Sequence, residues 1–78
     1  MKQLISQLTT REEEVLALIA DGLSNRQISH VLHISVYTVQ NHVQNLMMKL
    51  DVKNRTQAAS VYSRSLRRET GFYSVEQR

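Results

Sequence analysis

Apolar residues recur along the chain at the spacing of amphipathic helices, and no stretch of any length alternates between apolar and polar residues as a strand would. The clearest stripe is formed by Val39, Val43, Leu46 and Leu50, which are separated by four, three and four positions. This spacing puts all four side chains on one side of a helix, because a helix turns once in about 3.6 residues. The stripe therefore predicts a helix over about 36–50 with one buried side.

A first helix is predicted upstream, beginning at Thr9 or Thr10. Each threonine has a glutamate three residues later, which is the spacing of a capping box. Gly22 is expected to end this helix, because glycine readily adopts the positive φ that follows a helix C-terminus. Leu23 can then fold back on Leu18.

A second, short helix is predicted between Ser24 and Leu32. Ser24 has Gln27 three residues later as a capping partner. Ile28, Val31 and Leu32 follow the i, i+3, i+4 pattern, so they are expected to form its buried stripe.

The remaining helix boundaries follow from similar signals. Ser35 is the expected N-cap of the helix over 36–50, with Ile34 and Val39 as a hydrophobic staple around it. A fourth helix is expected from near Thr56 to about Glu69, with its core-facing residues at Ala58, Val61 and Tyr62. Gly71 is the expected terminator, and the tail over 73–78 is expected to be frayed.

These elements predict an all-α fold, a four-helix helix-turn-helix domain built around the second and third helices. Residues 1–78 are expected to form one domain with a core over about 8–70 and frayed ends, since a chain of 78 residues is long enough for only one small core.

The exposed side of the helix over 36–50 is rich in amides. It carries Tyr37, Gln40, Asn41, Gln44 and Asn45. Asparagine and glutamine can pair with the major-groove edge of adenine through two hydrogen bonds. A solvated surface would be served better by glutamate and lysine, which have higher helix propensity. The amide-rich face therefore favours a surface that reads DNA, with the second and third helices as the DNA-reading pair. On the residues alone, a solvated surface without a partner stays open as the alternative.

Charge is distributed unevenly along the chain. The net charge is +3, but residues 22–68 contain seven basic residues and one acidic residue, whereas residues 1–21 are net acidic. Basic charge thus accompanies the candidate reading helix, which suits a polyanionic partner. A solvated basic surface is the alternative that charge alone leaves open.

Several functional classes find no support in the sequence. The chain has no cysteine, no apolar run near the roughly 20 residues of a membrane span, and no signal-peptide pattern, so a cytoplasmic protein is expected. His30 and His33 lack a third ligand nearby, so neither a metal nor a cofactor is expected. No catalytic constellation stands out, and an enzyme is not predicted.

Specific motifs are spread over all four predicted helices: Leu-Thr-x-Arg-Glu-x-Glu-Val-Leu at 8–16, Gly-Leu-Ser-Asn at 22–25, Ile-Ser-x-x-Thr-Val at 34–39, Asn41-His42, Lys49-Leu50 and Asn54-Arg55-Thr56. In this combination the chain resembles the LuxR-type helix-turn-helix DNA-binding domain of bacterial response regulators and quorum-sensing regulators. Three positions depart from the family's usual pattern. Thr10 stands where proline is frequent, Val36 where a polar residue is frequent, and Gln40 where lysine is frequent.

The resemblance implies roles for individual residues. It implies base contacts by Gln40, Asn41 and Gln44, and backbone contacts by Ser24, Asn25, Arg26, Thr38 and Lys49. Two residues next to this set are expected to touch the DNA backbone as well: Arg55, which flanks the reading helix, and Ser35, its N-cap.

The resemblance also implies partners. Double-stranded DNA is the main one, and the chain is expected to regulate transcription from it. The helix that starts near Thr56 matches the family's usual dimer contact, and Ala59, Tyr62 and Leu66 form an apolar edge on it. A weak homodimer, strengthened on inverted-repeat DNA, is therefore expected. RNA polymerase is a further candidate partner.

Two other classes of function remain open at this point. One is an interaction module that docks on another regulator or on RNA polymerase without reading DNA, which an apolar patch from Val36, Met48 or Tyr62 would support. The other is the promoter-recognition region of a sigma factor, which the motifs at 8–16 and 54–56 disfavour.

Overall fold

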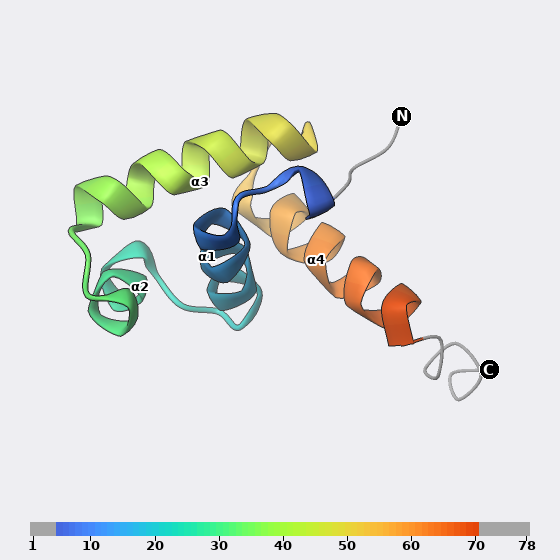
Figure 1. Ribbon diagram of the computed structural model, residues 1–78, viewed down its shortest axis with the longest axis horizontal. Helices are drawn as coiled ribbons and strands as arrows, with labels where there is room; N and C mark the ends of the chain where they lie inside the picture. The colour runs from blue at the N-terminus through green and yellow to red at the C-terminus, as the bar shows by residue number, and fades with distance from the viewer. Residues whose placement is uncertain (1–4, 71–78) are drawn as a thin grey trace.

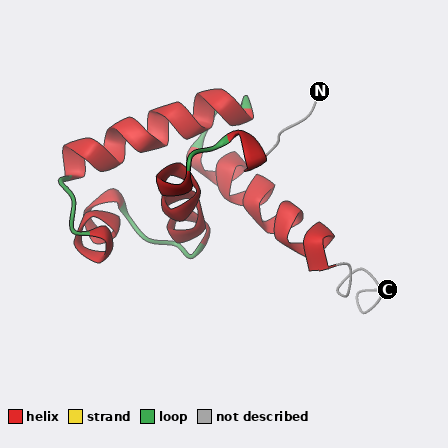
Figure 2. Cartoon of the chain, in the orientation of Figure 1, coloured by secondary structure: helices red, strands yellow, loops and turns green. Residues whose placement is uncertain are grey.

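Four α-helices follow one another in a computed structural model that describes residues 5–70, with side chains from 5 to 66. After a short 3-10 helix, η1 (Ile5–Gln7), come α1 (Thr10–Ala20), α2 (Asn25–Leu32), α3 (Val36–Leu50) and α4 (Arg55–Thr70). Figure 2 shows only helices and loops in the described part, so the predicted all-α class is confirmed. The predicted terminator Gly71, the tail and the first four residues lie outside the described residues.

The helices are arranged around α1, which packs against both α3 and α4. Figure 1 shows α3 lying across the other three helices, with α2 near its first turn and α4 near its last. Among the residues whose side chains the structure describes, the core between them contains ten buried apolar residues, from Leu8 to Val61, and is completed at its edges by half-buried side chains. Its largest fully buried side chains come from three helices and are Leu16, Ile28, Leu46, Leu50, Val15 and Val39.

The predicted helix starts are confirmed at α1, α2 and α3. Thr9, rather than Thr10, is the N-cap of α1, and Glu12 completes its capping box. Ser24 and Gln27 form the same arrangement at α2. Ser35 caps α3 by accepting a hydrogen bond from the Thr38 amide. Each cap satisfies backbone N–H groups that have no partner within the helix.

Residues with positive φ follow α1, α2 and α3. Gly22 has the predicted positive φ, at 92°, and the chain turns back so that the Leu23 amide donates to the Leu18 carbonyl at 3.1 Å. At the ends of α2 and α3 the left-handed residues are His33 and Asp51, with φ values of 59° and 57°. A side chain at such an angle is strained, so both positions carry a cost that glycine would avoid.

The prediction for the buried side of α2 was partly wrong. Ile28 is fully buried, but Val31 is 51% exposed and Ser29 takes its place in the interior. The helix is turned so that positions 28, 29 and 32 face the core, which also fits a helical period. Ser29 is small, and its hydroxyl donates to the Arg26 carbonyl at 2.7 Å, so its burial leaves no polar group unsatisfied.

Two elements differ slightly from the sequence prediction. The 3-10 helix η1 was not predicted, although Ile5 packs against the core and its carbonyl accepts from the Leu8 amide at 2.9 Å. The fourth helix begins at Arg55, one residue early, because the Asn54 side chain accepts from the Gln57 amide at 2.8 Å and so caps it.

Candidate nucleic-acid interface

The long helix α3 has one buried and one exposed side. Val39, Leu46 and Leu50 are fully buried, and Val43 is half-buried beside them. The three predicted base-contacting residues, Gln40, Asn41 and Gln44, are all exposed. Tyr37 and Met48 lie toward the two ends of the exposed side, with 72% and 76% of their surface accessible. The structure therefore presents the amides as one outward surface on a helix that the core fixes from behind.

Two hydroxyl groups lie at the start of this helix. Ser35 Oγ accepts from the Thr38 amide at 3.0 Å and donates to Thr38 Oγ1 at 2.9 Å. Ser35 is exposed and Thr38 is half-buried, so the structure brings these two predicted backbone-contacting residues together. Because the Ser35 hydrogen is directed to Thr38, the hydroxyl hydrogen of Thr38 is left to donate elsewhere.

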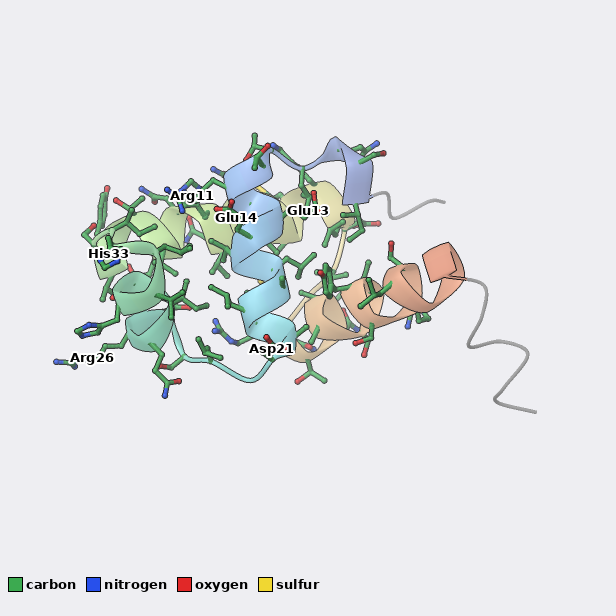
Figure 3. All side chains as sticks on the ribbon, turned by 60° about the horizontal axis from the view of Figure 1, so that its bottom comes forward. Arg11, Glu13, Glu14, Asp21, Arg26 and His33 are labelled. Carbon is green, nitrogen blue, oxygen red and sulfur yellow. The ribbon has the colours of Figure 1, made fainter. Side chains whose placement is uncertain are left out.

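Three more predicted residues lie at the start of α2. Ser24 Oγ accepts from the Gln27 amide at 3.2 Å, and the Ser24 amide donates to Gln27 Oε1 at 2.8 Å. Asn25 is half-buried and Arg26 is exposed. Figure 3 shows Arg26 at the outer edge of the molecule, where its charge is directed to solvent.

Lys49 has a partner inside the chain. Its Nζ lies 2.8 Å from Glu12 Oε1, and the Glu12 side chain is only 5% exposed. The same carboxylate oxygen accepts from the Thr9 amide at 3.0 Å. Burial by itself raises the pKa of the Glu12 carboxyl, but the hydrogen bonds from Lys49 and Thr9 and the charge of Lys49 outweigh it, so the pKa lies below its ordinary value. This ion pair joins α3 to α1.

Arg55 also has partners inside the chain. Its Nη1 donates to Asn25 Oδ1 at 2.7 Å, and its Nη2 donates to the Leu23 carbonyl at 2.7 Å. These bonds join the first residue of α4 to the start of α2. Neither they nor the contact between Lys49 and Glu12 could have been found from the sequence, because the partners are 30 to 37 residues apart and no periodic pattern connects them.

The exposed acidic residues of α1 lie on another surface. Figure 3 shows Glu13, Glu14 and Asp21 along α1, with α3 behind it. Glu14 forms an exposed ion pair with Arg11 at 3.0 Å. The acidic part of the sequence therefore corresponds to exposed carboxylates on α1 rather than on α3.

The predicted dimer edge is partly covered by the core. Ala59 and Tyr62 are half-buried and pack against the core, whereas Leu66 is 46% exposed. In the described residues, no three His, Cys, Asp or Glu side chains are placed so that they could hold a metal ion. None of the helices over 5–70 combines the length and apolar character that a membrane span requires.

Comparison with known proteins places this arrangement in a family. The family described as bacterial regulatory proteins, luxR family, matches residues 6–62. The response regulator protein VraR of Staphylococcus aureus (strain NCTC 8325 / PS 47) is 50% identical over 56 residues, which are 72% of this chain and 27% of that protein. VraR of Staphylococcus saprophyticus and of Staphylococcus epidermidis match with the same identity and coverage, so the chain spans about a quarter of these relatives. The chain therefore belongs to the luxR family of bacterial regulatory proteins and has the helix-turn-helix of its DNA-binding domain.

Proposed function

We propose that this chain regulates transcription by binding specific sequences of double-stranded DNA, with α3 in the major groove. The observation that supports this most is the exposed set of Gln40, Asn41 and Gln44, which lies outside the buried stripe of α3. In a helix-turn-helix, the residues near the start of the second helix reach the base edges. These three lie in its second and third turns.

The chemistry of the three side chains suggests which bases they read. Each amide can donate to N7 of adenine and accept from its N6 amino group, and each such pair discriminates by about 1–3 kcal/mol. Gln40 has no charge, so this position contributes hydrogen bonding rather than attraction to phosphates. We therefore expect each half-site to contain at least one A·T pair that cannot be replaced by another base pair without a loss of affinity.

Seven residues are proposed to contact the phosphates and sugars of the DNA backbone, and they fall into two groups. Within the described residues, a side-chain donor with no internal acceptor is found on Ser24, Asn25, Arg26 and Thr38, and Ser35 lies beside them with its hydroxyl hydrogen directed to Thr38. The other two, Lys49 and Arg55, would have to share or exchange their partners inside the chain before binding a phosphate. Arg26 is the cation of this set that is exposed without such a partner in the described residues.

Assembly and location complete the proposal. Two copies would meet through α4, with Ala59, Tyr62 and Leu66 at the seam, on an inverted-repeat site. The chain would act in the cytoplasm, where bacterial DNA lies, and could contact RNA polymerase when bound beside a promoter.

An interaction module that does not read DNA is less well supported. Val36 and Met48 are exposed, but they are twelve positions apart on α3, which is about 18 Å along the helix axis. Tyr62 is half-buried on another helix. These residues therefore do not gather into one apolar patch of the kind that marks a protein-binding surface.

The test is a change of sequence preference. Binding sites would be selected from fragmented genomic DNA with the native chain, and then with Gln40→Ala, Asn41→Ala and Gln44→Ala. We expect each variant to lose discrimination at one or two base pairs, by about 1–3 kcal/mol each. Asn45→Ala is the matched control, because it removes an exposed amide of the same helix that lies outside the proposed set. Unchanged preference in all three variants would show that the reading surface is misassigned.

A further inference from the structure

The side chain of Arg55 joins the first residue of α4 to the start of α2 through two short hydrogen bonds, one to Asn25 and one to the Leu23 carbonyl. We infer that Arg55 is a positioning residue that orients the Asn25 side chain, so that Asn25 presents its NH₂ group to a DNA phosphate. This inference rests on the proposed function, and it gives Arg55 a role other than that of a direct phosphate ligand.

The orientation of the Asn25 amide follows from the chemistry of its partner. A guanidinium group has five N–H donors and no acceptor, so only the oxygen of the amide can face it. The distance of 2.7 Å from Arg55 Nη1 to Asn25 Oδ1 is that of a good hydrogen bond. Since the amide is planar and its oxygen is directed to Arg55, its nitrogen is directed away from Arg55.

The Asn25 nitrogen is available to a ligand. No hydrogen bond from Asn25 Nδ2 is found among the described residues, although Asn25 is half-buried. In the same part of the chain, no buried side-chain nitrogen or oxygen lacks a partner, so this nitrogen is in contact with solvent. An NH₂ group fixed in this way is a donor with two hydrogens and no competing internal acceptor, which suits a phosphate oxygen.

The contact would be made by a neutral group that is already oriented. Two N–H groups of Arg55 donate to acceptors of the protein, and its charge lies close to the Asn25 oxygen. A free asparagine side chain could turn either its oxygen or its nitrogen outward, and the oxygen would repel a phosphate. Fixing the amide removes the unfavourable orientation before DNA binds, so less side-chain conformational entropy is lost on binding.

Asn25→Asp tests the orientation directly. The aspartate retains an oxygen for Arg55 but replaces the outward NH₂ group with a second oxygen. We expect the melting temperature to be unchanged or raised, because the bond to Arg55 becomes an ion pair at a helix N-terminus. Affinity for a fluorescein-labelled duplex of mixed sequence at low salt should fall.

The matched control is Gln27→Glu. It adds the same charge two positions away and retains the oxygen that accepts from the Ser24 amide. Its affinity should fall only by general repulsion, so Asn25→Asp should lose at least about tenfold more. Equal losses in the two variants would overturn the inference.

Arg55→Lys distinguishes positioning from direct contact. Lysine retains the charge, but it cannot hold both acceptors with a planar fork. If Arg55 positions Asn25, then Arg55→Lys should weaken DNA binding about as much as Arg55→Ala, and this cost should disappear in an Asn25→Ala background. If Arg55 binds a phosphate itself, lysine should rescue most of the affinity in either background, which would overturn the inference. Affinities are compared below the unfolding transition of each variant, measured by circular dichroism.

One further outcome separates this inference from the proposed function. If the native chain does not bind any duplex at low salt, both fail. If the native chain binds and Asn25→Asp behaves like Gln27→Glu, the DNA-binding function stands and the positioning role of Arg55 fails alone.

Discussion

At the scale of single residues, Glu12 has two functions in the fold. Its carboxylate completes the capping box of α1 by accepting from the Thr9 amide, and it pairs with Lys49 on α3. The first function was predictable from the spacing of Thr9 and Glu12. The second was not, because an ion pair between residues 37 positions apart depends on how two helices pack.

This carboxylate should make stability depend on pH in acid. Its pKa is lower in the folded chain than in the unfolded one, where it is near 4.5, so the unfolded chain takes up the proton first as pH falls. The stabilising contribution is therefore fully present above that value and is lost as pH falls through the lower, folded pKa. Glu12→Gln retains an oxygen for Thr9 but has no charge for Lys49.

The measurement is a series of thermal melts from neutral to acidic pH. We expect the native chain to melt at a higher temperature than Glu12→Gln near neutral pH, and the difference to narrow in acid. Glu13→Gln, which removes an exposed carboxylate of the same turn, is the control and should differ little from the native chain. A difference for Glu12→Gln that stays constant over the whole range would contradict the role assigned to the charge.

At the scale of helices, the C-terminus of α3 offers a second test. Asp51 has a left-handed backbone there, and its negative charge lies at the negative end of the helix dipole. Asp51→Gly removes both costs but adds freedom to the unfolded chain. We expect the free energy of unfolding to rise by about 0.5–1.5 kcal/mol in urea titrations.

Asp51→Asn provides the control at the same position. It removes the charge but retains a side chain that tolerates the left-handed conformation, so it should give only part of the gain. If Asp51→Gly lowers the free energy of unfolding, then the backbone strain at this position is smaller than its φ indicates.

The helices were predictable where the signals are local. Thr9, Ser24 and Ser35 cap their helices through residues three positions later, and the stripe of α3 needs only its own period. The rotation of α2 was not predictable, because Val31 and Ser29 both fit a helical stripe and only packing against α1 and α3 decides between them. The candidate site divides in the same way. The exposed amides of α3 follow from its period, whereas the internal partners of Lys49 and Arg55 follow from tertiary structure.

At the scale of the whole molecule, one domain makes few contacts with DNA, so selective binding should need two copies. Leu66 is exposed and Tyr62 is half-buried beside it on α4. We expect a monomer in dilute solution and two chains on each palindromic site, measured by light scattering and by titration of labelled DNA. Tyr62→Glu with Leu66→Glu should abolish the cooperativity of binding, because two like charges would face their own copies.

The control adds the same two charges elsewhere on α4. Thr56→Glu with Ser60→Glu has the same four-residue spacing at exposed positions on a different side of the helix. It should weaken binding by repulsion but leave cooperativity intact. Binding of a single native chain to each palindrome, or equal cooperativity in the two double variants, would rule out the proposed seam.

The bond between Arg55 and Asn25 has an energetic consequence for the assembled complex. In the proposed dimer, α4 packs against its copy. The first residue of α4, Arg55, is hydrogen-bonded to Asn25 at the start of α2, so a shift of α4 along its axis also disturbs the Asn25 amide. Coupling of this kind is reciprocal. If self-association makes phosphate binding more favourable by a given free energy, then phosphate binding makes self-association more favourable by the same free energy. Dimer and operator would then stabilise each other through the protein itself, in addition to the proximity that a shared piece of DNA provides.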